Sequence, residues 1–384
     1  MKAVSVDAMN IISKVGNTSE ETFANILNGM TGVELHHRKD IDDEPIWAAL
    51  IDDLNYGKLT SFIDQPEKYT RFENLQIASI SEASKTSNID LSDPQTIFLF
   101  STTKGNISIL EKTSFSDAVA ERTSLYHSGK LIAAYFNNTN EPVIISNACI
   151  SGVVALMHAQ RLLKSGIYKN AVVVGADVIT QFVYSGFKSF QALSSGRCAP
   201  FSAERNGINL GEAAATIILT TDSNSESELN SIKILEGSVT NDSNHISGPS
   251  RTGDELKTAI QNSIKRSGVS AEEIGFISAH GTATLYNDEM EAKAFYAAGL
   301  GEVPINSLKG YFGHTLGAAG VVESAISILS LIHNTVIPTA GFVSSGVTSD
   351  VTICSTPLKI NSNYCLKTAS GFGGCNAALI FSKS

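Results

Sequence analysis

Residues 144–152 read IISNACISG, and the rest of the chain is organised around this stretch. An apolar strand over residues 143–146 runs into a turn of small residues. The turn brings Cys149 to the start of a helix predicted over about residues 152–164, which Lys164 and Gly166 would close. A thiol at a helix N-terminus faces unpaired backbone N–H groups and the positive end of the helix dipole, and both favour the thiolate. Cys149 is therefore a candidate nucleophile; the alternative is a small thiol buried under a helix.

The composition is that of a globular protein with a large core. Of the 384 residues 42% are hydrophobic and 17% are charged, and the net charge of −10 argues against a general nucleic-acid binder. Five cysteines without CxxC spacing favour a reducing compartment over disulfides or a metal site. The N-terminal residues lack a signal-peptide pattern, and no apolar run reaches membrane-spanning length. We therefore expect a soluble, cytoplasmic protein.

Two halves of strand and helix patterns follow each other, residues 1–225 and 230–384, with a polar linker at 221–228. Long apolar strands alternating with helices indicate a parallel sheet covered on both faces. In each half a loop with a reactive residue precedes a buried helix, which indicates duplication of an α/β unit. The expected strands lie at residues 3–6, 95–101, 143–146, 171–175, 213–219, 233–239, 274–279, 304–307, 335–339, 371–375 and 377–382.

Two regions are less regular. Residues 36–93 are polar and weakly periodic, so we expect a short surface cap with a helix near residues 44–53. Residues 115–136 are typical of a long helix, broken at Ser128-Gly129.

Two histidines occupy places similar to that of Cys149. His280 follows a strand, and His314 lies in a glycine-bounded loop before an apolar helix over about residues 318–332. Because functional groups of α/β sheets gather beyond the carboxyl ends of strands, we expect the thiol and both imidazoles to converge. A fourth soft ligand is not evident, which disfavours zinc. Glu323 is almost the only charge on the apolar helix, and Lys309 is its expected partner.

Five motifs resemble those of the β-ketoacyl carrier-protein synthases of the elongating type, and they follow one another along the chain in the order of that family. NACISG at residues 147–152 resembles the active-site motif of that family, and AHGTAT at 279–284, ending at Asn287-Asp288, resembles its first histidine motif. KGYFGHTLGAAG at residues 309–320 is similar to its lysine-to-second-histidine motif, and SGFGGCN at 370–376 to its C-terminal loop. PF at 200–201, ERNG at 204–207 and LGE at 210–212 resemble its mid-chain motif.

The resemblance implies a thiolase-like α/β fold, with duplicated halves in a five-layered αβαβα sandwich, and usually a dimer. It implies that Cys149 takes an acyl group from a carrier protein and that a malonyl-carrier thioester then loses carbon dioxide and attacks it, extending a fatty-acid or polyketide-type chain by two carbons. It implies that His280 and His314 stabilise the enolate, and that Lys309 and Glu323 fix the electrostatics and the loop around His314. The remaining assignments are an oxyanion hole from the backbone N–H groups of Cys149 and Phe372, and contacts to the phosphopantetheine substrate from Thr282, Thr284, Ser370 and Gly371.

The resemblance implies no bound metal, nucleotide or redox cofactor. It implies acyl carrier protein as a partner, and either a homodimer or a heterodimer with a chain-length-factor subunit. The carrier is acidic, so docking needs a local basic patch, for which Lys188, Arg197 and Arg205 are candidates.

The chain departs from the family pattern at three places. Ser370 replaces an aromatic gate residue, Cys375 replaces a threonine, and the region at about 36–100 is short. Ser370 and the short region suggest an unusual acyl chain, such as a polyene or an aryl-primed chain.

Three alternatives remain open. A thiolase would use a second cysteine as base, for which Cys375 is the candidate. A starter-type synthase would carry asparagine in place of His314. A non-catalytic chain-length factor would typically lack the nucleophile, whereas Cys149 is present.

Overall fold

The computed structural model describes residues 2–222, 228–245 and 248–384. Within them ten strands form one main sheet, in the order β11-β10-β14-β15-β9-β1-β8-β6-β4-β5. The order is nearly symmetric about the boundary between β9 and β1, where one residue pair, Ser5 and Lys233, joins the two parts. The strands are β1 (Ser5–Ser13), β4 (Thr96–Ser101), β5 (Val143–Ile145), β6 (Asn170–Asp177), β8 (Ala213–Thr220), β9 (Ile232–Asn241), β10 (Ile274–Ser278), β11 (Ile305–Asn306), β14 (Tyr364–Gly371) and β15 (Cys375–Lys383).

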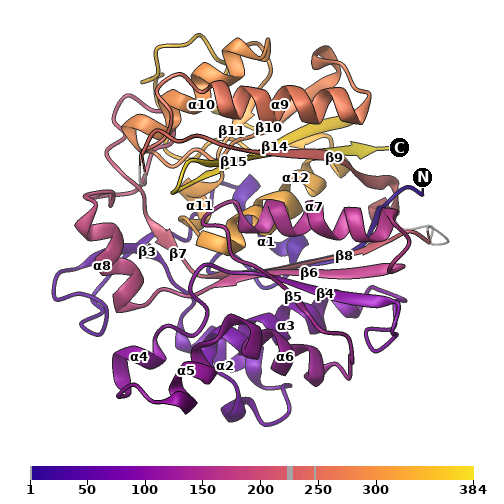
Figure 1. Ribbon diagram of the computed structural model, residues 1–384. Helices are drawn as coiled ribbons and strands as arrows, with labels where there is room; N and C mark the ends of the chain where they lie inside the picture. Colours follow the sequence, from indigo (N-terminus) through magenta and orange to yellow (C-terminus); the bar gives the residue numbers. More distant parts are fainter. Residues whose placement is uncertain (1, 223–227, 246–247) are drawn as a thin grey trace.

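The two parts of the sheet lie one above the other, with helices between and outside them (Figure 1). Helices α7 (Ser151–Lys164) and α12 (Ala319–Ile332) form the middle layer, and α12 is buried along almost its whole length. Helix α9 (Asp254–Ser267) covers β9 and β15 on the outside, with α10 (Leu285–Ala297) beside it. Helix α3 (Arg71–Ser84) covers β1, β6 and β8. The result is the expected five-layered αβαβα sandwich of the thiolase-like class.

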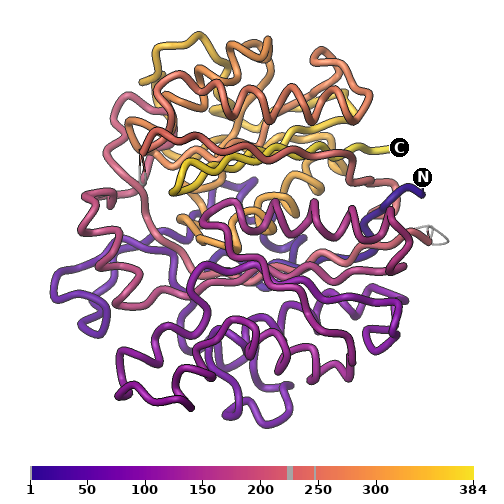
Figure 2. The backbone as a smooth tube through the Cα atoms, viewed as in Figure 1, coloured from indigo at the N-terminus to yellow at the C-terminus, as the bar shows by residue number. Residues whose placement is uncertain are grey.

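Parallel pairing places strand ends at a common edge. β4 pairs in parallel with β5 and β6, and β10 pairs in parallel with β11 and β14. The carboxyl ends of β5 and β10 therefore present the segments that carry Cys149 and His280 to the middle layer. Figure 2 shows the chain from indigo to magenta mainly in the lower part of the molecule and from orange to yellow mainly in the upper part.

Residues 36–93 are not a surface cap, and that prediction was wrong. They hold β3 (Ile46–Ala49), α2 (Asp53–Thr60) and α3, so the helix expected near 44–53 is a strand followed by a later helix. Helix α3 is an outer layer of the sandwich. It lacks a clear apolar stripe because polar residues on it are buried with partners: the Glu73 carboxylate binds Arg122 and the side chain of Asn106.

Three further boundaries differ from expectation. The helix break in 115–136 lies at Ser124, between α5 (Asp117–Thr123) and α6 (Leu125–Tyr135), and Ser128-Gly129 is inside α6. Residues 372–374 form the turn of a hairpin, because β14 ends at Gly371 and β15 begins at Cys375. The strand expected at 335–339 is β12 (Thr335–Val336), which pairs with β13 (Leu358–Lys359) outside the main sheet. In the strand order of the main sheet, β14 occupies the position that mirrors β6.

The remaining elements surround this frame. Most of the predicted linker lies outside the described residues, so the boundary between 1–225 and 230–384 stays a prediction. The additional elements are α1 (Ser19–Leu27), β2 (Glu34–His36), α4 (Ile109–Lys112), α8 (Gln181–Ser189), β7 (Leu210–Gly211) and α11 (Lys309–Phe312).

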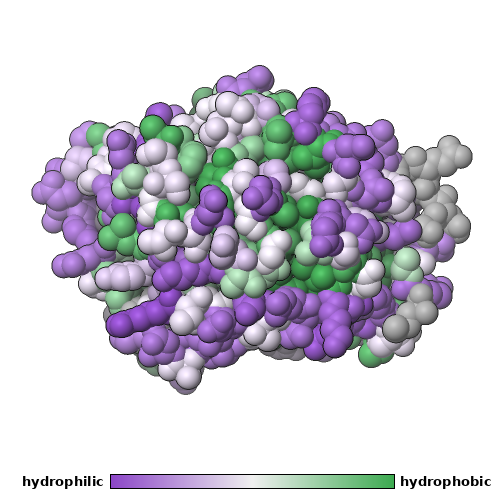
Figure 3. All heavy atoms as spheres, turned by 90° about the horizontal axis from the view of Figure 1, so that it is seen from above, coloured by the Kyte–Doolittle hydropathy of each residue, from purple (hydrophilic) through white to green (hydrophobic). Residues whose placement is uncertain are grey.

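The outer face is mixed in character. Seen from above in Figure 3, hydrophobic areas are interspersed with hydrophilic side chains. In the parts of the chain that the structure covers, no helix combines the length and apolar character needed to cross a membrane.

Candidate active site

A strained turn presents Cys149. Ala148 has a φ of 43°, in the left-handed region that residues other than glycine rarely adopt. The Ser151 hydroxyl closes the turn by donating to Ala148 O at 2.6 Å and accepting from Asn147 N–H at 2.8 Å. Helix α7 begins at Ser151 and ends at Lys164, as predicted to within one residue. The turn therefore holds the thiol just before the first turn of the helix, where it is only 8% exposed.

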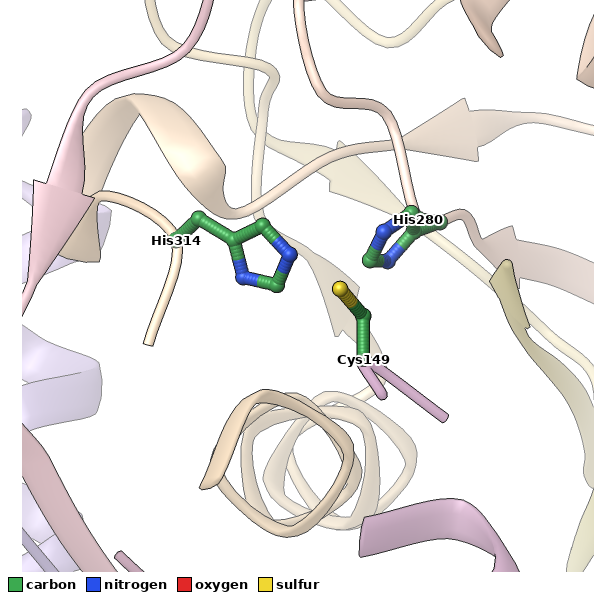
Figure 4. Close-up of side chains that lie close together, drawn as sticks. All are labelled: Cys149, His280 and His314. Carbon is green, nitrogen blue, oxygen red and sulfur yellow. The ribbon is translucent and has the colours of Figure 1, made fainter. Parts of the chain in front are cut away.

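Both predicted histidines meet the thiol. The Cys149 sulfur and one ring nitrogen each of His280 and His314 lie within 4.8 Å of one another (Figure 4). The two imidazole rings are nearly perpendicular, with centroids 5.0 Å apart. All three side chains are buried, so their charges and hydrogen bonds act with little screening from water.

Hydrogen bonds at Nδ1 determine which ring nitrogen carries the proton. The backbone N–H of Leu316 donates to Nδ1 of His314 at 3.0 Å. The Lys309 ammonium, which has no lone pair, lies 3.5 Å from Nδ1 of His280. In both neutral rings Nε2 is therefore the N–H donor. Nε2 of His314 is buried and has no hydrogen-bond partner within the described residues, so it is available to a bound oxygen atom.

Burial opposes charge on all three groups. It lowers the pKa of His280 and His314 well below the usual value, and the positive charges of Lys309 and Lys367 act in the same direction. Burial also raises the pKa of the Cys149 thiol to about 12, although Lys309 and the backbone N–H of Phe372 oppose this. At Cys149, desolvation therefore opposes the thiolate that the helix N-terminus favours.

A cluster of charged side chains lies behind the histidines. Lys309 binds Glu323 Oε1, as predicted, and donates to the backbone oxygen of His280 at 3.0 Å. Lys367 of β14 lies 2.7 Å from Glu323 Oε2 and is fully buried. Lys367 was not among the predicted site residues, since nothing in its local sequence places it opposite Glu323. One carboxylate is thus shared by two ammonium groups.

Two further buried carboxylates, also not predicted, hold the loop after His280. Glu291 accepts hydrogen bonds from the backbone N–H groups of His280 and Gly281, at 2.8 Å and 2.6 Å. Asp288 accepts from the N–H of Thr282 at 2.9 Å, and burial raises its pKa to about 7. Two sequence signals bore on their role: both acids lie on helix α10 directly after the loop, and Asp288 ends the first histidine motif.

The predicted oxyanion and substrate residues border the same space. The N–H of Phe372 hydrogen-bonds the Cys149 sulfur, and a Cβ added to Gly371 would lie 3.0 Å from Cys149 N. A cavity of about 470 Å³ reaches the thiol and both imidazoles. Its lining includes all four residues expected to contact the substrate, Thr282, Thr284, Ser370 and Gly371.

Aromatic rings form one wall of this cavity. Phe187 stacks on Phe372 with ring centroids 5.7 Å apart, and Phe190 meets Phe372 edge-on at 5.4 Å. Ser370, which also lines the cavity, is small and donates to Asn376 Oδ1 at 2.8 Å. The wall therefore offers flat apolar surface close to the thiol.

The predicted basic patch is only partly present. Arg205 is buried and binds the backbone oxygens of Ser202 and Gly346, so it is not a docking residue. Lys188 is exposed but paired with Asp42 at 2.7 Å, and Arg197 donates to Val33 O at 3.2 Å.

The metal and thiolase alternatives find little support in the geometry. Cys149, His280 and His314 are three possible zinc ligands, but two ammonium groups behind the rings oppose a cation. The Cys375 thiol is directed at the backbone oxygens of Phe372 and Asn147, at 3.4 Å and 4.0 Å, and does not line the cavity.

A buried thiol that faces two imidazole donors and a backbone N–H, inside a duplicated five-layered sandwich, defines an acyl-transfer site that works through a thioester. Family comparison agrees. The β-ketoacyl synthase N-terminal domain matches residues 100–225 and the C-terminal domain of the same family matches residues 232–343, together more than half of the chain. The chain belongs to the β-ketoacyl synthase family, a family of acyltransferases.

Individual relatives extend over the full length. The 3-oxoacyl-[acyl-carrier-protein] synthase 2 of Staphylococcus aureus (strain N315) is 25% identical, covering 100% of this chain and 98% of the relative. Among solved structures, the ishigamide ketosynthase/chain length factor superposes with a TM-score of 0.91 at 24% identity, covering 100% and 99% of the two chains. A type II ketosynthase bound to the hexaketide and in complex with its acyl-carrier protein gives 0.85 at 19% identity, with full coverage of both chains.

Proposed function

We propose that this chain catalyses the decarboxylative condensation of a malonyl thioester with an acyl group held on Cys149. The observation that carries the proposal is the pair of Nε2–H donors, one buried without a partner among the described residues, directed at the space in front of a buried thiol. Such donors suit an oxygen that becomes negatively charged during the reaction.

In the first step the Cys149 sulfur attacks an acyl thioester on acyl carrier protein. The tetrahedral oxyanion accepts hydrogen bonds from the backbone N–H groups of Cys149 and Phe372. The carrier thiol leaves and takes up the proton that Cys149 loses. This exchange conserves one thiol and one thioester, so it needs no further reactant.

In the second step a malonyl-carrier thioester occupies the same cavity. Its C–COO⁻ bond breaks, carbon dioxide leaves, and the electron pair forms an enolate whose oxygen accepts from Nε2–H of His280 and His314. The enolate carbon attacks the acyl-Cys149 carbonyl. The Cys149 sulfur leaves and takes up one proton from the solvent, and the product is a β-ketoacyl thioester two carbons longer. The reaction balances without a bound metal or redox cofactor.

Neutral imidazoles suit this step better than charged ones. An imidazolium would pair with the malonyl carboxylate and stabilise the ground state, whereas a neutral donor gains most when charge moves to the thioester oxygen. Burial and the adjacent ammonium groups, which lower the pKa of both histidines, therefore support the assignment.

The proposed partners are acyl carrier protein and a second subunit, either another copy or a chain length factor. Both kinds of partner occur among the solved relatives, since one is a ketosynthase/chain length factor and another is in complex with its acyl-carrier protein. The presence of Cys149 beside both histidines argues that this chain is the active member of such a pair. A cytoplasmic location remains a prediction.

The cavity also bears on the acyl chain. Ser370 leaves space where an aromatic gate was expected, and the rings of Phe187, Phe190 and Phe372 offer flat contacts. We propose a conjugated or aryl-primed acyl chain. Competition between a polyenoyl and a saturated acyl-carrier thioester of equal length tests this, and a preference for the saturated primer would contradict it.

The central test is intact-mass analysis after mixing the protein with acyl-carrier and then malonyl-carrier thioesters. We expect an acyl adduct on the wild type, its absence in Cys149→Ala, and release of a product longer by two carbons. A folded wild type that forms no adduct with saturated, polyenoyl or aryl primers would refute the catalytic assignment and favour a non-catalytic subunit.

A further inference from the structure

Lys367 places a second positive charge beneath the active site. It lies on β14, is fully buried, and its ammonium group donates to the backbone oxygens of Thr368, Ser278 and Ala279 at 2.7, 3.1 and 3.3 Å. These three carbonyl groups hold the ammonium group in place, and Glu323 Oε2 pairs with it at 2.7 Å.

Two of these backbone oxygens belong to the residues just before His280. Lys367 therefore fixes the end of β10 at the point where the chain leaves the sheet and becomes the first histidine loop. Lys309 donates to the next backbone oxygen, that of His280, at 3.0 Å. Two ammonium groups thus hold three consecutive carbonyl groups at the base of the loop.

The charges around Lys367 come from several elements. Glu323 faces it from α12, Lys309 from α11 and Glu291 from α10, while His280 and His314 lie on the cavity side. The Glu323 carboxylate lies between two ammonium groups, so these three side chains carry one excess positive charge, which the Glu291 carboxylate opposes. Burial lowers the pKa of Lys367, and Glu323 counteracts this effect. Glu291 is engaged by the N–H groups of His280 and Gly281 and accepts from the Thr368 hydroxyl at 3.3 Å.

We propose that Lys367 is a positioning residue for the decarboxylation step, which holds the His280 loop and adds a second positive charge, beside that of Lys309, behind both imidazoles. The inference rests on the function proposed above. Lys367 does not line the cavity, so it acts through His280 and His314 and not by touching the substrate.

The charge of Lys367 has a predictable effect on the histidines. Burial is the main cause of their lowered pKa values, and the charges of Lys309 and Lys367 lower them further. If the charge of Lys367 is removed, the pKa of each imidazole rises. Protonation then begins at a higher pH. The acid limb, which is the fall in decarboxylation rate on the acidic side of the pH profile, therefore moves to higher pH.

Variants of one position separate charge from packing. Lys367→Met removes the charge at similar length, Lys367→Gln keeps an amide donor for the carbonyl groups, and Lys367→Arg keeps the charge. Cys365→Ala is the matched control, because Cys365 is buried on the same face of β14 two residues earlier. Acyl-adduct formation and carbon dioxide release are measured separately from pH 5 to pH 9, after circular dichroism has shown folding.

We expect Lys367→Met and Lys367→Gln to form the acyl adduct at nearly the wild-type rate but to release carbon dioxide about tenfold to a hundredfold more slowly. Their acid limb should lie at higher pH than that of wild type. Lys367→Arg and Cys365→Ala should keep the wild-type limb. If the Lys367→Met variant does not fold, the Lys367→Gln variant gives the same comparison.

An acid limb in Lys367→Gln that coincides with that of wild type would overturn the proposal, as would an equal shift in Cys365→Ala. A wild type that forms no adduct would overturn the proposed function and this inference together. If the wild type condenses normally and Lys367→Gln has the same pH profile of carbon dioxide release, only the role of Lys367 is overturned.

Discussion

Gly152 of α7 and Gly320 of α12 lie backbone to backbone. A Cβ added to Gly152 would come within 2.7 Å of Val321 N and 2.9 Å of Gly320 Cα, and one added to Gly320 would come within 2.4 Å of Val153 N. The two buried helices therefore meet without side chains between them. Since Cys149 precedes α7 and His314 precedes α12, this contact sets how closely the thiol and the second imidazole approach.

Alanine at either glycine should destabilise the protein. Gly152→Ala and Gly320→Ala force two helix backbones apart, and overpacking of this kind costs about 1–3 kcal/mol. Urea unfolding measures the loss. Gly57→Ala is the control, because Gly57 lies inside α2 with nothing within 4 Å of an added Cβ, and it should be neutral or slightly stabilising. Equal stability of all three variants would contradict the close contact.

His314→Ala and Cys149→Ala should separate the two chemical steps. Loss of the His314 donor should slow carbon dioxide release from malonyl-carrier thioester by about 10²–10³-fold while the acyl adduct still forms. Cys149→Ala should abolish the adduct but leave both donors in place, so carbon dioxide release should continue. Adduct mass and carbon dioxide release, measured on the same samples, test both expectations; loss of both activities in each folded variant would argue against separate roles.

Alkylation of Cys149 should depend steeply on pH. Because burial raises the pKa of this thiol to about 12, it is protonated at neutral pH, and the thiolate fraction rises about tenfold per pH unit up to that value. The iodoacetamide rate at Cys149, followed by peptide mass spectrometry between pH 7 and pH 9, should rise without levelling. A plateau in this range would instead indicate a thiolate stabilised at the helix N-terminus. Cys149→Ala identifies the modified peptide.

Glu323→Gln should be strongly destabilising. It leaves the ammonium groups of Lys309 and Lys367 buried without their shared carboxylate, and an uncompensated buried charge costs about 3–5 kcal/mol. The unfolding midpoint in urea should fall accordingly, and Lys367→Met in the same chain should recover part of the loss by removing one charge. Glu141→Gln, which breaks an exposed pair with Lys130, should leave the midpoint nearly unchanged. An unchanged midpoint in Glu323→Gln would contradict the charge cluster.

Much of the site follows from local sequence. Cys149, His280 and His314 each stand in a small-residue loop between a strand and a helix, so their convergence follows from the rule for parallel strand ends. The pairing of Lys309 with Glu323 follows from a lone acid on an apolar helix beside the loop that carries a base. These arguments need only the order of the elements along the chain.

Other parts depend on contacts that the local sequence does not encode. Lys367 lies on a strand that continues beyond it into buried small residues, and its partner Glu323 is on a different element, so the pair becomes visible only when β14 and α12 are packed. Helix α3 was not predicted because its polar residues, such as Glu73, are buried against partners far along the chain. The depth at which Cys149 is buried, which raises the pKa of its thiol, is likewise a property of the finished fold.

Strand β15 lies between β14 and β9 in the interior of the sheet, although it follows the other nine strands of that sheet in chain order. During translation, β9 therefore leaves the ribosome long before the strand that covers its edge. Until residues 375–383 have left the exit tunnel, the nascent protein carries an open strand edge at β9, and such edges are sites of aggregation. Synthesis of this enzyme should thus depend on chaperones that bind such edges, and a stalled translation product lacking β15 should be cleared by proteases.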